Sequence, residues 1–232
     1  MIWNRVPSVS ARRTLALLSA LLTVFFWRQA PADDEPVDSL EKEVRAFEEK
    51  DRKEAPEPGG VLFLGSSSIR LWDTAKAFPQ TKITNRGFGG SQIADSVHFA
   101  ERIAIPYRPR LIVFYAGDND VAAGKSAEEV FADFKEFTGK VHASLPATRI
   151  AFIAIKPSPL RWKFFDTQCR ANDRIREFIK SDGRLSYIDV VKPMLGDDGE
   201  ARRELFKKDN LHLNDEGYRV WAGVIKPFLD EK

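Results

Sequence analysis

Residues 61–70 read VLFLGSSSIR, in which four apolar residues run into a glycine and three consecutive serines. An apolar run without alternation is typical of a strand that is covered on both faces, as in a parallel sheet. The serines at its end allow two interpretations. Either they form a polar turn that caps a helix, or one of them is a nucleophile displayed where a strand passes into a helix.

Strand-like and helix-like patterns alternate along the chain after this stretch. The candidate strands are residues 61–64, 82–85, 111–116, 150–155 and 185–190. The helical patterns include residues 126–145, begun by a capping box of Ser126 and Glu129, residues 166–181, and a last helix begun by Asn214. This order predicts right-handed crossovers and an α/β fold, a flavodoxin-like three-layer α/β/α sandwich with a central five-stranded parallel sheet.

The first 32 residues differ from the remainder. Three arginines precede an uncharged apolar stretch at residues 14–27, and Ala30-Pro31-Ala32 follows as a small-x-small pattern. This layout predicts a secretory signal peptide over residues 1–32, a secreted or periplasmic protein, and no stable membrane span after cleavage. An uncleaved anchor is the alternative. The remainder is expected to comprise a linker with a short amphipathic helix, residues 33–60, and one domain, residues 61–232.

The charge balance and the cysteine content exclude some classes of protein. The chain has 36 basic and 34 acidic residues, but four of its arginines and none of its acids lie in residues 1–32, so the remainder has a net charge near −2. Residues 33–232 therefore lack the excess of positive charge that is typical of proteins that bind nucleic acids. Cys169 is the single cysteine, so no intrachain disulfide can form, and stability must come from core packing.

Four polar clusters fall where a doubly wound sheet binds its ligands, beyond the carboxyl ends of the strands. They are Gly65–Ser68, Gly87–Ser91, Gly117–Asp120 and Asp209–His212. Taken singly, the first three are ordinary helix caps, tight corners or chain reversals. The fourth is more informative, because a carboxylate three residues before a histidine can accept the Nδ1 proton and leave Nε2 free as a base.

Together the clusters resemble the four marker blocks of the SGNH hydrolases, the GDSL-type esterases and lipases. "GSSS" corresponds to the GDS block with Ser67 as the nucleophile, and "NRGFGGS" to the glycine block with Gly90 as an oxyanion donor. "GDND" corresponds to the G-x-N-D block with Asn119 as a further donor, and "DNLH" to the block that carries Asp209 and His212. The resemblance spans about residues 60–230. It departs from the family at Ser66, where the usual residue is aspartate.

The resemblance implies a serine esterase that hydrolyses carboxylic (acyl or acetyl) esters through a Ser-His-Asp triad and an acyl-enzyme. The oxyanion hole would comprise the amides of Ser67 and Gly90 and the side chain of Asn119. Neither a metal nor an organic cofactor is implied. The possible substrates are small-molecule, carbohydrate or lipid esters, namely short-chain esters, acetylated sugars and lysophospholipids.

Other interpretations stay open at this point. A flavodoxin-like module could cradle phosphate with the amides of Gly65–Ser68 and catalyse nothing, although Asn119 and the Asp209 to His212 spacing would then have no explanation. Asp118 and Asp120 could hold a cation, but no further ligands cluster near them in the sequence. Arg161 and Trp162, in the segment after the fourth strand, are candidate substrate-binding residues, or they pack the next helix onto the sheet.

The N-terminal pattern yields a direct test. When the full chain is expressed in a Gram-negative host, we expect a periplasmic product shortened at about Ala32, because the small residues at positions 30 and 32 suit a signal peptidase. N-terminal sequencing of the purified protein would show the cleavage point. A full-length product that fractionates with the membrane would instead identify residues 14–27 as an anchor.

Overall fold

The computed structural model of the chain describes Met1 and residues 35–230, so the predicted signal peptide, apart from its first residue, lies outside the described residues. The central sheet has five parallel strands in the order β2-β1-β3-β4-β5. They are β1 (Val61–Gly65), β2 (Ile83–Gly87), β3 (Leu111–Tyr115), β4 (Arg149–Ile153) and β5 (Leu185–Ile188). The predicted fold class, with a five-stranded parallel sheet between helices, is confirmed.

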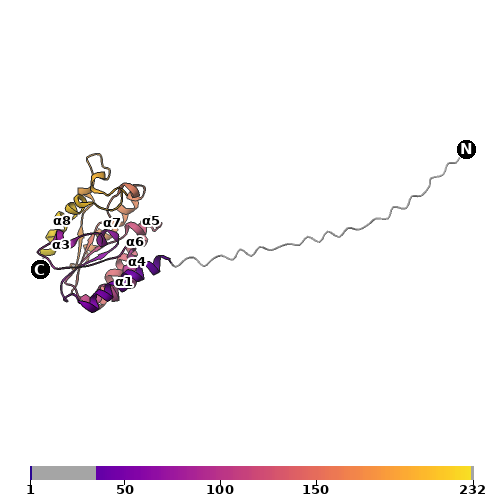
Figure 1. Cartoon of the computed structure of the whole chain (residues 1–232). Helices are drawn as coiled ribbons and strands as arrows, with labels where there is room; N and C mark the ends of the chain where they lie inside the picture. Colours follow the sequence, from indigo (N-terminus) through magenta and orange to yellow (C-terminus); the bar gives the residue numbers. More distant parts are fainter. Residues whose placement is uncertain (2–34, 231–232) are drawn as a thin grey trace. The chain divides into compact units, whose positions relative to one another are not determined.

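Helices cover both faces of the sheet (Figure 1). One layer consists of α1 (Glu35–Lys53), α4 (Ile93–Ile103), α6 (Ala127–Ser144) and α7 (Phe165–Ile179). The other contains α2 (Ser67–Arg70), α3 (Thr74–Ala77) and α8 (Asp215–Asp230). The short connecting elements are α5 (Asp118–Ala122) and the 3₁₀ turns η1 (Ile105–Tyr107), η2 (Pro159–Phe164), η3 (Lys192–Met194) and η4 (Arg203–Leu205).

Each strand supplies both cores because successive side chains point to opposite faces. In β1, Leu62 and Leu64 belong to the core beneath α4 and α6, whereas Val61 and Phe63 belong to the core beneath α8. The same alternation holds in β3 and β4. A strand buried on both faces needs apolar residues at every position, which explains the unbroken run that begins the quoted stretch.

The sequence pattern located most element ends to within one or two residues. The capping box of Ser126 and Glu129 is present at the start of α6, and the Asn214 side chain accepts hydrogen bonds from two amides in the first turn of α8. Strand β2 runs on to Gly87, two residues past the predicted end. It includes Arg86, whose buried guanidinium pairs with Asp51. A charged residue inside a strand gives no strand signal, so the sequence pattern does not predict this extension.

Helix α1 packs onto the same face as α4. Leu40 and Val44 are buried in the core, and Arg102 of α4 forms ion pairs with Glu41 and Glu48 of α1 at 2.7 Å. Figure 1 shows α1 lying beside α4. Residues that precede the first strand therefore contribute to the core of the sandwich.

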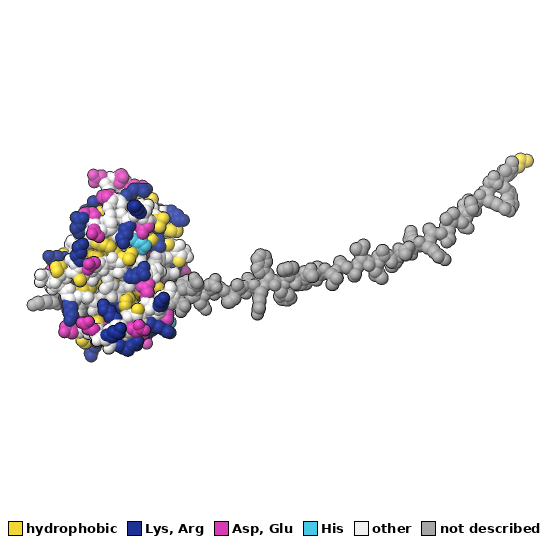
Figure 2. Space-filling view, in the orientation of Figure 1, with side chains coloured by type: hydrophobic (Ala, Val, Ile, Leu, Met, Phe, Trp, Pro, Cys, Tyr) yellow, Lys and Arg dark blue, Asp and Glu magenta, His cyan; other side chains and the backbone are white. Residues whose placement is uncertain are grey.

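The surface in Figure 2 carries basic and acidic side chains interspersed over the face that is shown. Among the described residues, charged side chains pair in several places, as in the contacts of Arg45 with Glu41 and of Lys180 with Glu177. Within residues 35–230, none of the helices combines the length and the apolar character that crossing a membrane requires.

The packing of α1 predicts a measurable contribution to stability. Val44→Ala should lower the free energy of unfolding by about 2 kcal/mol, because it removes buried methyl groups and leaves a cavity. Urea denaturation followed by circular dichroism would measure this loss. Lys42→Ala, at an exposed position of the same helix, is the matched control and should change stability by less than about 0.5 kcal/mol. Equal values for the two variants would show that α1 is not part of the cooperative fold.

Candidate active site

Three of the four polar clusters meet because of the register of the sheet. Gly65, the last residue of β1, lies between Gly87 of β2 and Tyr115 of β3. Backbone hydrogen bonds continue beyond the strand ends, from the Phe88 amide to Gly65 O at 2.8 Å and from the Ser66 amide to Tyr115 O at 3.0 Å. The loops that carry the serines, the glycines and Asn119 therefore leave the same edge from adjacent strands.

Gly65 makes the sharp turn between β1 and α2 possible. Its φ is +139°, and a Cβ atom at this position would lie 1.8 Å from Tyr115 O. No residue with a side chain fits there without displacing the neighbouring strand. The turn places Ser67 at the first position of α2.

The structure distinguishes the three consecutive serines. Ser66 and Ser68 are buried, with 0% and 1% of their surface exposed, whereas Ser67 is partly exposed. The Ser67 hydroxyl lies 3.1 Å from His212 Nε2. The hydroxyl of Tyr218, in α8, donates a hydrogen bond to Ser68 O at 2.9 Å and so holds the turn in place. Among the three, Ser67 is the residue that reaches the histidine.

His212 is oriented by Asp209. His212 Nδ1 lies 2.7 Å from Asp209 Oδ2, and Asp209 Oδ1 accepts hydrogen bonds from the amides of Leu211 and His212, each at 2.9 Å. Asn210, at φ +57°, allows the chain to turn tightly enough for these contacts. Burial raises the pKa of Asp209, but the two amides and the imidazole outweigh it and lower the pKa to about 2.

Asn119 follows β3 and contacts two other parts of the site. Its Nδ2 donates to Ser91 O at 2.9 Å, and its Oδ1 accepts a hydrogen bond from Arg161 Nη2 at 2.8 Å. Ser91 directly follows Gly90, whose φ of +77° favours glycine and whose Cβ position faces open space. The Gly89 amide donates to Glu43 Oε1 of α1 at 3.1 Å, so α1 also contacts the glycine loop.

The two carboxylates beside Asn119 have protein partners. Asp118 Oδ2 lies 3.1 Å from Lys156 Nζ and 3.0 Å from Arg161 Nη1, whereas Asp120 pairs with Lys125 and accepts a hydrogen bond from the Ile93 amide. Burial raises the pKa of Asp118, but the two cations outweigh it and lower the pKa. For Asp120, burial dominates and raises the pKa. Within residues 35–230, no three His, Cys, Asp or Glu side chains gather to hold a metal ion.

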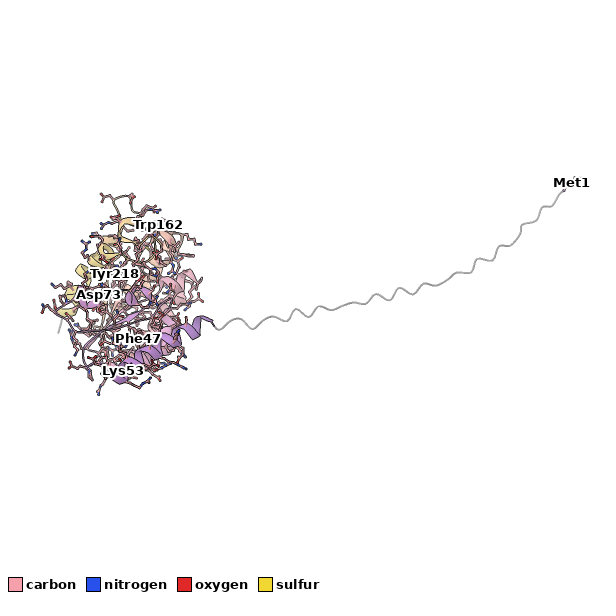
Figure 3. The ribbon with its side chains drawn as sticks, in the orientation of Figure 1. Met1, Phe47, Lys53, Asp73, Trp162 and Tyr218 are labelled. Carbon is pink, nitrogen blue, oxygen red and sulfur yellow. The ribbon has the colours of Figure 1, made fainter. Side chains whose placement is uncertain are left out.

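The two candidate substrate-binding residues differ in their surroundings. Arg161 directs its guanidinium at Asp118 and Asn119. Trp162 stacks on Phe165, with ring centroids 4.5 Å apart, and lines an open cavity of about 1140 Å³ with Pro159 and residues 195–198 and 200–204. Figure 3 shows Trp162 at the end of the molecule opposite Lys53, which lies in the last turn of α1.

Some contacts of the site carry no signal in the sequence. Lys156, Glu43 and Tyr218 lie outside the marker blocks, yet they contact Asp118, Gly89 and Ser68 respectively. Each contact joins residues that are far apart in the chain, so spacing does not predict it.

The arrangement has the geometry of an activated nucleophile. His212 Nε2 is within hydrogen-bond reach of the Ser67 hydroxyl, and Asp209 fixes the opposite ring nitrogen as the one that carries a proton. The imidazole can therefore accept the Ser67 proton. Ser67 lies at the N-terminus of a short helix and beside the glycine loop, where backbone amides could meet a developing negative charge.

Comparison with known proteins points to one family. Residues 70–220 match the sequence model of the GDSL-like lipase/acylhydrolase family, a range that begins just after Ser67. No curated protein sequence matches the chain.

Solved structures resemble the chain over most of its length. One, proposed as a platelet activating factor from Streptococcus pneumonia, has a TM-score of 0.75 at 20% identity and covers 83% of this chain and 94% of its own. A GDSL-like lipase from Bacteroides thetaiotaomicron has a TM-score of 0.70 at 20% identity, covering 81% and 97%. A carbohydrate esterase family 3 protein from Talaromyces cellulolyticus has a TM-score of 0.58 at 18% identity, covering 74% and 96%. At these identities the likeness concerns the fold.

The contacts of Asp209 predict its titration. Because its pKa is lower in the folded chain than in the unfolded chain, the ionised carboxylate stabilises the fold above about pH 4, and this contribution is lost as the pH falls through 2. Carboxyl-carbon NMR should therefore give a midpoint near 2 for Asp209. In His212→Ala, which keeps the backbone amide and loses the ring donor, the midpoint should rise part of the way to 3.8. A wild-type midpoint near 3.8 would contradict the hydrogen bonds described.

Proposed function

The chain belongs to the GDSL-like lipase/acylhydrolase family of the SGNH hydrolases, which act on esters, and on that premise we propose that it cleaves carboxylic esters through an acyl-enzyme on Ser67. The observation that carries this proposal is the hydrogen-bonded chain from Asp209 through His212 to Ser67, with distances of 2.7 and 3.1 Å. The loops of Ser67, Asn119 and His212 are far apart in the sequence and meet here. A convergence of this kind is typical of a reaction centre and is not needed for a structural turn.

In the proposed reaction, His212 Nε2 takes the Ser67 proton as the serine oxygen bonds to the acyl carbon. The negative charge that forms on the carbonyl oxygen is met by the amides of Ser67 and Gly90 and by the Asn119 carboxamide. The alcohol then leaves with the proton from His212. A water molecule attacks the acyl-enzyme with the same histidine as base, which releases the acid and restores Ser67. Asp209 stabilises the imidazolium in both halves of the reaction.

The burial of the neighbouring hydroxyls supports Ser67 as the nucleophile. Ser66 and Ser68 are enclosed by protein, so an ester could not reach them without opening the turn. The aspartate that usually precedes the nucleophile in the family is replaced by Ser66. Its hydroxyl is buried and has no hydrogen-bond partner among the described residues.

A phosphate-binding module without catalysis is the competing function. Backbone amides alone suffice for such a module, which has no use for a histidine within 3.1 Å of a serine hydroxyl or for an aspartate behind that histidine. The hydrogen-bonded chain therefore favours the esterase.

The cavity beside Trp162 suggests a place for part of the substrate. It adjoins η2, whose Leu160 amide donates to Asn210 O in the loop of Asp209 and His212 at 3.0 Å. We place the leaving group on this side. Hydrolysis of p-nitrophenyl esters of increasing chain length, of acetylated xylan and of a lysophospholipid, each by wild type and Trp162→Ala, would identify the substrate class. A loss that is confined to one class would identify the group that Trp162 contacts.

The nucleophile can be tested by labelling. A fluorophosphonate probe should label the wild-type protein and should not label Ser67→Ala, because labelling requires a hydroxyl whose proton is removed by a base. Ser66→Ala and Ser68→Ala are the matched controls and should be labelled. Labelling of Ser67→Ala would show that a neighbouring residue is the nucleophile. A wild-type protein that is not labelled would favour the phosphate-binding module.

The proposed oxyanion donor can be tested by two substitutions at one position. Asn119→Ala should lower kcat about 10²- to 10³-fold and leave KM nearly unchanged, because the donor meets charge that exists only in the transition state. Asn119→Asp should be at least as damaging, since it places an acceptor opposite Ser91 O and beside the forming oxyanion. Steady-state kinetics with a p-nitrophenyl ester would measure both. A near-normal kcat in the Asp variant would show that Asn119 is not an oxyanion donor.

A further inference from the structure

Arg161 makes two contacts that connect the substrate-facing side of the site with a buried ion cluster. It lies in η2, its side chain is 16% exposed, and its two terminal nitrogens reach neighbouring residues of the loop after β3. Nη2 donates to Asn119 Oδ1 at 2.8 Å, and Nη1 pairs with Asp118 Oδ2 at 3.0 Å. The guanidinium is anchored by the hydrogen bond to Asn119 and by the ion pair with Asp118, although Nη1 itself makes no hydrogen bond.

From these contacts we propose that Arg161 is a positioning residue, which orients the Asn119 carboxamide so that its N–H group, and not its oxygen, faces the oxyanion. The inference rests on the proposed function, because it concerns the oxyanion hole of the same ester hydrolysis. It assigns Arg161 a role in the transition state in place of direct substrate binding.

The orientation follows from the hydrogen-bonding capacity of the groups. A guanidinium has donors only, so the Asn119 atom that faces it must be Oδ1. The Nδ2 group then lies on the other side, where one of its two hydrogens goes to Ser91 O and the second can meet the oxyanion. Rotation about χ2 of asparagine is soft. Without Arg161 only Ser91 O holds the carboxamide, so its N–H group is aimed less firmly at the negative charge.

The guanidinium is itself held by a buried ion pair. Asp118 accepts from Lys156 Nζ at 3.1 Å, and Lys156, which is 1% exposed, also donates to the Tyr115 hydroxyl at 3.2 Å. The cluster thus holds the guanidinium in the position from which it donates to Asn119.

A double-mutant cycle tests whether Arg161 acts through Asn119. We would compare Arg161→Met, Asn119→Ala and the double variant with wild type, using p-nitrophenyl acetate as the substrate. Each protein is expressed from the full sequence and purified in the form that the host produces. Arg161→Met should lower kcat about 10- to 100-fold with KM nearly unchanged, and should have little further effect when Asn119 is already alanine. Arg161→Lys should be intermediate, because an ammonium can donate to Oδ1 but cannot span both partners.

The same data separate this role from the alternatives. If the losses of the two single variants multiply in the double variant, the inference is overturned. If Arg161→Met raises KM and leaves kcat unchanged, Arg161 binds substrate and the inference is overturned as well. A shift of the acid limb of the kcat/KM profile in Arg161→Met would indicate an effect through His212 and would overturn it too. Lys163→Met, which removes an exposed cation from the same turn, is the matched control and should leave kcat unchanged.

Folding and function are checked independently. If thermal unfolding shows that Arg161→Met does not fold, the cycle is completed with Arg161→Lys and the same additivity criterion applies. A wild-type protein without Ser67-dependent hydrolysis would overturn the proposed function and the inference together. Additive losses in an enzyme whose activity depends on Ser67 would overturn the inference alone.

Discussion

The parallel pairing of β1 with β2 on one side and β3 on the other is the constraint on which the site depends. Because all strands run in the same direction, their carboxyl ends meet at one edge, and the register places Gly65 between Gly87 and Tyr115. A shift by one residue would turn Leu62 and Leu64 away from their core and displace the loops relative to one another. The same apolar packing that stabilises the sheet therefore positions its polar loops.

Asp118 and Asp120 show how strongly the surroundings decide the role of a residue. They flank Asn119 and are both buried, yet their pKa values shift in opposite directions. Asp118 faces two cations and belongs to the cluster behind Asn119. Asp120 joins the start of α4 to α5 through the Ile93 amide. One carboxylate thus supports the orientation of Asn119, and the other connects the two loops that flank the site.

Helix α1 extends the functional unit beyond the residues that match the family. The match covers residues 70–220, whereas α1 spans Glu35–Lys53 and still reaches the glycine loop through Glu43. Its apolar face also covers part of the core. Phe47 of this helix, labelled in Figure 3, packs against the same core. Residues before the first strand therefore support both the fold and the loop that carries Gly90.

The sequence by itself determined the elements and the chemistry of the loops. Unbroken apolar runs indicated buried parallel strands, capping residues located α6 and α8, and the spacing of Asp209 and His212 indicated an oriented base, because each of these signals is local. Strand order, the burial of Ser66 and Ser68, the docking of α1 and the contact of Arg161 with Asn119 were decided by the tertiary structure alone. These features join residues that are far apart in the chain, and which of them meet depends on how the layers pack.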